Sequence, residues 1–219
     1  LFNMYYQYSY EKDYLSEFSN QGEALDKLET GTDLAVLKTG DESVYRYDQM
    51  GTHSYENSSM QTGTNGTSYY FSVASGDITN FFNEVDLNTP WDYHYENLDS
   101  RTILDRLAAV KYFVVKAGEE EYLPYGYDTL AAEAEKKDRL YRAYECKNAL
   151  PIGYTYDSYI PEEKYAKMST VEKQQALLQG VVLADSTVPE TTPEFNDREV
   201  SYKLVTGSGC KEKDGKLII

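Results

Sequence analysis

The segment Val110–Lys116, with the sequence VKYFVVK, restricts the possible folds more than any other part of the chain. Its apolar residues are nearly continuous, which is typical of a strand that is covered on both faces. It follows closely after Ile103, Leu104 and Leu107, which recur at the spacing of one helix face. A helix leading directly into such a strand favours a layered architecture. We therefore predict an α/β (or α+β) fold, with a mixed sheet built on this strand and flanked by helices.

Weaker patterns predict the surrounding elements. A first helix is expected at residues 20–28, ended by Gly31, and a second from an N-cap at Asp77 through Val85. A third is expected after an N-cap at Asp99 or Ser100. Two more are expected, one starting at Pro161 and one after a Ser169–Glu172 capping box. Strands are expected at 43–50, 68–73, 140–146, 152–156, 199–206 and 216–219. The strand at 43–50 alternates Arg46 and Asp48 with Tyr45 and Tyr47, which indicates half burial. Residues 34–37 form a strand or a packed loop, and 118–140 is acidic and loop-like.

The composition changes near residue 187. Residues 185–197 contain two prolines and few apolar residues, and only strands are expected beyond them. We predict a mixed α/β domain at 1–186, followed at 187–219 by a linker and the first strands of a truncated β domain, the start of a β-sandwich. Because the chain lacks an initial methionine, we expect it to be a piece of a larger protein.

Charge excludes one large class of partner. The chain has 21 Lys and Arg against 37 Asp and Glu, a net charge of −16. Nucleic-acid binding depends on cations that neutralise phosphates, so no nucleic-acid partner is expected. Binding flat onto anionic lipid is disfavoured for the same reason. No apolar run approaches the roughly 20 residues of a membrane-spanning helix.

Catalytic motifs are absent from the sequence. It has no phosphate-binding glycine loop, no nucleophile elbow and no H-E-x-x-H pattern. His53 and His94 are best explained as exposed or hydrogen-bonded residues. Cys146 and Cys210 match no zinc spacing, and the two either pair or are both free. We therefore expect no catalytic residue, no metal and no cofactor in this chain.

The residues that best fit a binding role lie in and after a long polar stretch. The chain contains 23 tyrosines, whose flat faces suit half-hydrated surfaces. Residues 51–67 are predicted to be a loop or a set of turns, longer than a connection requires. Its amide and hydroxyl side chains can bond to sugar hydroxyls, and nearby rings can stack on a pyranose. The candidate binding residues are Tyr55, Asn57, Asn65, Tyr69 and Tyr70.

Three stretches together resemble one family. They are SVYRYDQM with the following ENSSMQTGTNGTSYYFS, then ILDRLAAVKYFVV, and then NALPIGYTYDSYIPEEKYAKMSTVEKQQALLQGVVL. The second is similar to a family strand pattern, L-L-G-V-K-Y, with Ala109 where glycine is usual. The third, with its Leu-Pro-Ile-Gly-Tyr and Ser-x-x-Glu-Lys-Gln segments, is the most specific. Over roughly 44–183 the chain resembles the bacterial YfhO membrane-protein family.

The resemblance implies a setting on the outer face of the cell membrane. YfhO-type proteins are large multi-pass membrane proteins similar to C-fold glycosyltransferases, which take sugar from a polyprenyl-phosphate carrier. They are associated with glycosylation of lipoteichoic acid or related envelope polymers in Gram-positive bacteria. This chain would be an extracytoplasmic accessory domain, with its own transmembrane region and an envelope glycan as partners. The alternatives are a carbohydrate-binding or adhesion module, or a structural ectodomain, without catalysis.

Overall fold

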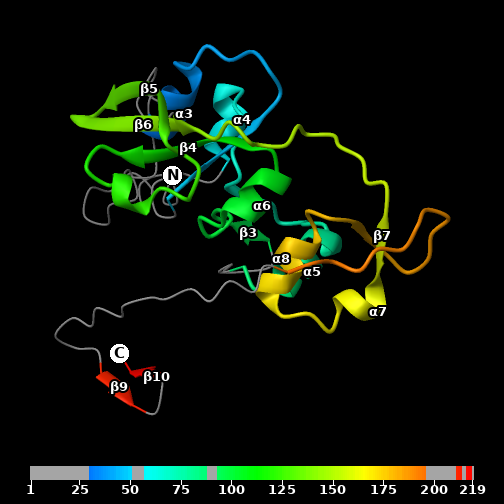
Figure 1. The fold of residues 1–219 in the computed structure, drawn as a ribbon. Helices are drawn as coiled ribbons and strands as arrows, with labels where there is room; N and C mark the ends of the chain where they lie inside the picture. Colours follow the sequence, from blue (N-terminus) through cyan, green and yellow to red (C-terminus); the bar gives the residue numbers. More distant parts are fainter. Residues whose placement is uncertain (1–29, 51–56, 88–92, 196–210, 214–215, 219) are drawn as a thin grey trace, which may run out of the picture.

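A four-stranded mixed sheet forms the centre of the fold. The computed structural model describes residues 30–50, 57–87, 93–195, 211–213 and 216–218 (Figure 1). The strand order is β1-β4-β6-β5, with bounds Arg46–Gln49, Val110–Lys116, Arg139–Glu145 and Thr129–Lys136. β1 runs parallel to β4, and the β4–β6 and β6–β5 pairs are antiparallel. The predicted fold class, a mixed sheet flanked by helices, is confirmed.

Strand β4 carries core residues on both faces, as its continuous apolar sequence predicts. Phe113 and Val115 belong to the apolar cluster that contains residues of α5 and α6. Tyr112 and Val114 belong to a second cluster, with residues of α3, on the opposite face. Because β1 and β6 pair with its two edges, β4 is a central strand. Figure 1 shows α3 beside β5 and β6, with α5, α6 and α8 on the other side of β4.

The remaining elements are short. They are α3 (Gly31–Leu37), α4 (Ser58–Thr62), β2 (Tyr69–Tyr70), α5 (Gly76–Glu84), β3 (His94–Tyr95), α6 (Thr102–Leu107), η3 (Glu120–Tyr122), β7 (Tyr159–Pro161), α7 (Glu162–Tyr165), α8 (Thr170–Ala176), β8 (Val181–Leu183), β9 (Lys211–Lys213) and β10 (Lys216–Ile218). The β2–β3 and β9–β10 pairs are antiparallel, and β7–β8 is parallel.

The helix after Thr30 corrects two sequence predictions. We expected 34–37 to be a strand or a packed loop, and Gly31 to end a helix. Instead Gly31 is the first residue of α3, which spans that run. Thr30 and Asp33 form a capping box, in which each side chain pairs with the other residue's backbone N–H. The Tyr47 hydroxyl also donates to Asp33, so the helix start is tied to β1.

Helix capping was predicted with mixed success. The Ser169–Glu172 capping box at the start of α8 is confirmed. A helix follows Pro161 as expected, with the proline at the N-cap. The predicted caps of α5 and α6 are wrong, because Ser75 and Arg101 occupy those positions.

Four segments differ from their predictions. The acidic stretch at 118–140 contains the edge strand β5, in which Ala132 and Ala134 lie toward the apolar cluster on the α3 side and Glu133 and Glu135 are exposed. Residues 152–156 form no strand. The described part of 51–67 contains the helix α4, so it is not loop throughout. The first strand is limited to Arg46–Gln49 and is covered on both faces rather than half-buried.

Several predictions fall on residues outside the described ranges. They are the helix at 20–28, the strand at 199–206, and the residues His53, Tyr55 and Cys210. The division at 187 and the start of a β-sandwich stay predictions. Cys146 is buried with a free thiol. In the described part of the chain, no helix has the length and apolar character to cross a membrane.

Candidate functional site

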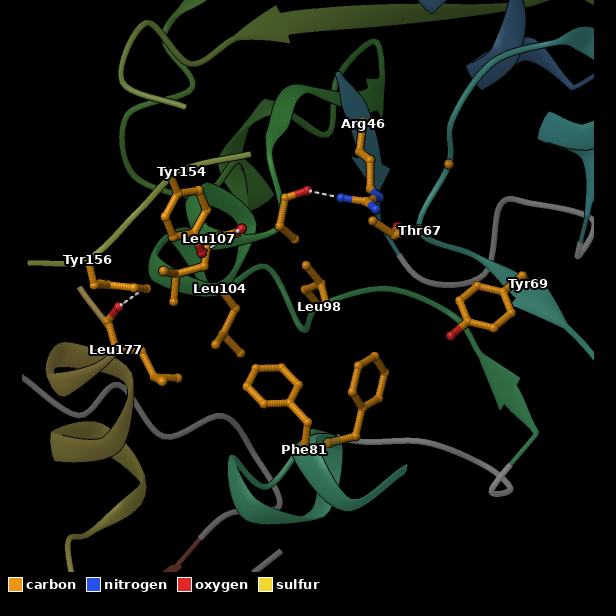
Figure 2. Close-up of a pocket in the computed structure, with 13 residues that line it drawn as sticks. Arg46, Thr67, Tyr69, Phe81, Leu98, Leu104, Leu107, Tyr154, Tyr156 and Leu177 are labelled. Carbon is orange, nitrogen blue, oxygen red and sulfur yellow. Dashed lines mark hydrogen bonds between the residues drawn. The ribbon is translucent and has the colours of Figure 1, made fainter. Parts of the chain in front are cut away.

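A pocket of about 340 Å³ opens between α5, α6 and the end of α8 (Figure 2). Most of its lining side chains are apolar or aromatic. The lining residues are Arg46, Gly66, Thr67, Tyr69, Phe81, Phe82, Leu98, Leu104, Leu107, Ala108, Tyr154, Tyr156 and Leu177. Such a volume and lining fit the small-molecule sites of other proteins, which are mostly apolar with a few polar groups.

Aromatic rings form opposite walls of this pocket. Figure 2 shows Tyr154 and Tyr156 on one side, Tyr69 on the other and Phe81 below. The Tyr69 ring packs against Tyr95 with centroids 4.6 Å apart, which holds it in place. Burial and the neighbouring Tyr95 raise the pKa of Tyr69 to about 12, so this hydroxyl stays protonated near neutral pH.

The tyrosine hydroxyls near α6 and α8 are already used. Tyr154 donates to the Leu107 carbonyl at 3.2 Å, and Tyr156 donates to the Leu177 carbonyl at 2.5 Å. These bonds join the segment that contains Tyr154 and Tyr156, which has no regular structure, to the ends of α6 and α8. The tyrosines therefore contribute ring surface to the pocket, together with hydroxyl oxygens that can still accept a hydrogen bond.

Arg46 is the cationic residue in the lining. It is the first residue of β1 and is partly buried. Its Nη1 donates to the Ala108 carbonyl at 2.7 Å, and Figure 2 shows the guanidinium between that carbonyl and Thr67. Among the residues that the structure describes, no carboxylate forms an ion pair with Arg46. A guanidinium has five N–H donors, so most of its donors remain available.

Two buried carboxyl groups lie behind the pocket wall. Asp48 on β1 and Asp105 on α6 are both 0% exposed, and they lie close enough for each to shift the pKa of the other. Burial and the negative charge of Asp48 hold the pKa of Asp105 well above its usual range. Neither Asp105 oxygen accepts a hydrogen bond from a described donor. Asp105 is therefore the protonated, neutral member of the pair, and Asp48 carries the negative charge.

Asp48 is bonded directly to the pocket wall. It accepts hydrogen bonds from the Thr67 hydroxyl at 2.6 Å, the Leu98 N–H at 3.0 Å and the Gln49 N–H at 2.8 Å. Thr67 and Leu98 both line the pocket. Burial raises the pKa of Asp48, and these three bonds oppose that rise by favouring the ionised form. The pair positions two wall segments and does not itself reach the pocket.

The predicted binding residues are partly brought together. Tyr69 lines the pocket, whereas the neighbouring Tyr70 is 42% exposed and packs edge-on against Tyr93. The Asn57 amide clamps the backbone of Tyr70, donating to its carbonyl at 2.9 Å and accepting from its N–H at 3.0 Å. Asn65 is exposed and donates to the Tyr45 carbonyl at 3.0 Å. Tyr55 lies outside the described residues.

Several pocket residues were not selected from the sequence. The alternation along residues 43–50 indicates a half-buried strand and does not single out Arg46 as a pocket residue. Phe81 was assigned only to a helix core, and Tyr154 and Tyr156 to a strand. The signal that could have found the pocket was the concentration of tyrosine in segments that also contain glycine and proline.

Comparison with known proteins identifies the family. The family model described as bacterial membrane protein YfhO matches residues 1–216. The chain belongs to the YfhO family. It is also 27% identical over 227 residues to the "Uncharacterized protein YfhO" of Bacillus subtilis (strain 168). That match covers 96% of this chain and 25% of the Bacillus protein, so the chain spans about a quarter of that relative. No solved structure matches the chain.

Proposed function

We propose that this chain is an extracytoplasmic accessory domain of a multi-pass YfhO-like protein that glycosylates lipoteichoic acid or a related envelope polymer, with sugar taken from a polyprenyl-phosphate carrier. The observation that supports the setting is the family match over residues 1–216, together with a relative four times as long. In this proposal the domain recognises the acceptor, and the membrane region of the whole protein supplies the chemistry.

The surface beside β2 is the part of the domain that fits an envelope glycan. Tyr70 and Tyr93 lie edge to face with centroids 5.5 Å apart, and both side chains are more than one third exposed. The Asn57 amide fixes the backbone of Tyr70, which keeps this ring presented outward. Exposed, preorganised aromatic faces are suited to stacking on the apolar face of a pyranose.

The first experiment tests on which side of the membrane this domain lies. In the full-length protein with Cys210 replaced by serine, Val73→Cys introduces a thiol at a position that is 91% exposed. A membrane-impermeant maleimide added to intact cells should label this variant. The buried Cys146 is the internal control and should stay unlabelled without Val73→Cys. Labelling that requires the membrane to be opened would refute the extracytoplasmic placement.

The second experiment tests acceptor recognition. Tyr70→Ala removes the exposed ring but leaves the backbone that Asn57 clamps, so folding should be nearly unchanged. The matched control is Tyr125→Ala, a ring that is 87% exposed and does not line the pocket. Tyr70→Ala in the full-length protein should lower the sugar content of the polymer in cells, and Tyr125→Ala should not. Equal sugar content in both strains, at equal expression, would refute this role.

A further inference from the structure

The pocket beside Arg46 combines a hydrocarbon lining with one positive charge. Its floor is made of Leu98, Leu104 and Phe82, which are all less than one tenth exposed. These side chains offer no hydrogen bond to a ligand. An occupant that fills the floor must therefore present carbon and not hydroxyl groups, because a buried hydroxyl without a partner costs binding free energy.

The polar groups at the mouth of the pocket favour an anion. The carbonyls of Leu107, Ala108 and Leu177 already accept bonds from Tyr154, Arg46 and Tyr156. The guanidinium of Arg46 keeps donors available, and no described carboxylate pairs with it. On a chain with net charge −16, a half-buried arginine without an acidic partner is unusual. A carboxylate or phosphate can take two parallel hydrogen bonds from such a group.

The size of the pocket limits the occupant. At about 30 Å³ per non-hydrogen atom, a volume of about 340 Å³ holds roughly 11 atoms. A single sugar ring has a similar size, but its hydroxyls would face the hydrocarbon floor. A chain of about ten carbons matches both the volume and the lining.

We propose that this pocket binds an anionic amphiphile, with a hydrocarbon segment of about ten carbons on the floor formed by Leu98, Leu104 and Phe82 and a carboxylate or phosphate head on Arg46. The inference does not depend on the glycosyltransferase proposal. If it holds, the domain has a lipid-type site beside the separate aromatic surface at Tyr70.

Ligand selectivity of the unmodified 219-residue chain is the first test. Titration calorimetry with decanoate and decyl phosphate should show binding, with a dissociation constant below about 1 mM. Decanol lacks the charge, inorganic phosphate lacks the hydrocarbon, and glucose has the size of the pocket but the wrong polarity. Each of the three should bind at least about tenfold more weakly, because decanol loses a charged hydrogen bond, and phosphate and glucose lose the burial of several CH₂ groups. Equal binding of decanol, of phosphate or of glucose, or no binding of decanoate, would overturn the proposal.

Two variants test whether the ligand binds in this pocket. Arg46→Gln should weaken decanoate by about tenfold or more and leave decanol unchanged, because only the charged head contacts this residue. Ala108→Leu adds three carbons to the lining and should weaken both ligands. The matched control is Arg142→Gln, which removes an arginine paired with Glu120 and Glu133 away from the pocket.

Folding is monitored by the thermal unfolding transition of each variant. Arg46→Lys keeps the charge but not the paired hydrogen bonds, so its affinity for decanoate should lie between those of the wild type and Arg46→Gln. Loss of affinity in Arg142→Gln equal to that in Arg46→Gln would overturn the proposal. Unchanged affinity in a folded Arg46→Gln variant would do the same.

Discussion

Replacing one or the other carboxyl of the buried pair by an amide separates the two roles that we assign to them. Asp48 is the acceptor of three hydrogen bonds, and Asp105 is the neighbouring carboxyl that carries the proton. An asparagine is close in shape to either aspartate but always carries donor hydrogens on one terminal atom. The same chemical change should therefore have unequal effects at the two positions.

At Asp48 the amide conflicts with its surroundings. If the oxygen of an introduced asparagine keeps the bonds from Thr67 and Gln49, its NH₂ group faces the Leu98 N–H. One buried donor then loses its partner, at a cost of about 1 to 3 kcal/mol, and the charged acceptor is lost as well. We expect Asp48→Asn to lower the free energy of unfolding by about 2 to 4 kcal/mol.

At Asp105 the amide keeps the neutral charge of the native group. The protonated carboxyl is neutral, and no described group donates a hydrogen bond to it, so a neutral amide can take its place. We expect Asp105→Asn to change the free energy of unfolding near neutral pH by less than about 1 kcal/mol, or to raise it.

The pH dependence gives a second, independent readout. The pKa of Asp105 is raised in the folded state, mainly by burial and then by the charge of Asp48. Between the unfolded pKa of about 3.9 and the higher folded pKa, the native state holds the extra proton. The contribution of Asp105 to stability is therefore complete below pH 3.9 or so and is lost as pH rises through the folded pKa, by up to about 1.4 kcal/mol per pH unit.

Urea unfolding of the wild type and of both variants, repeated from about pH 5 to about pH 8, measures these differences. The stability advantage of Asp105→Asn over the wild type should grow with pH. Equal destabilisation by Asp48→Asn and Asp105→Asn, or a difference between wild type and Asp105→Asn that is independent of pH, would refute the assignment of the proton to Asp105.

Three further outcomes test the fold. Val114 is 1% exposed on the central strand, so Val114→Asp should lower the free energy of unfolding, measured in urea, by on the order of 4 kcal/mol. In the wild type, amide exchange should be slowest along Val110–Lys116. Ser169→Ala removes the bond from the Glu172 N–H and should cost about 1 kcal/mol, measured the same way. Ala109→Gly should stabilise the chain by roughly 0.5 to 1 kcal/mol, because Ala109 has φ +60°, a conformation that glycine adopts more easily. Loss of stability in this last variant would contradict the strain argument.

Elements with a local signal could be predicted, and those that depend on distant partners could not. The strand at Val110–Lys116 needs only its own apolar run, and the Ser169–Glu172 box only its own spacing. Strand β5 has the sequence TLAAEAEK, whose alanines and glutamates favour helix. It is a strand because β6 pairs along its whole length, and no local pattern reports that pairing.

In the candidate site, too, some residues could be predicted from a local pattern and others depend on distant partners. Tyr69 was selected as an aromatic near a polar loop, and it does line the pocket. Asn57 was selected for its amide, which instead completes the backbone bonding of Tyr70. An amide that follows a polar loop can serve a ligand or its own backbone equally well. Only the positions of α4 and β2 relative to each other distinguish the two uses.

The polar side of β1 explains why the pocket and the carboxyl pair occur together. The alternation along β1 predicts half burial, whereas both faces of the strand are covered, and Arg46 and Asp48 lie toward the pocket wall and α6. Polar groups inside a fold must be compensated. Asp48 is compensated within the molecule, by three donors and by the neutral state of the neighbouring Asp105. Arg46 has one described side-chain partner, the Ala108 carbonyl, so its remaining N–H groups are available to the acidic ligand head that we propose.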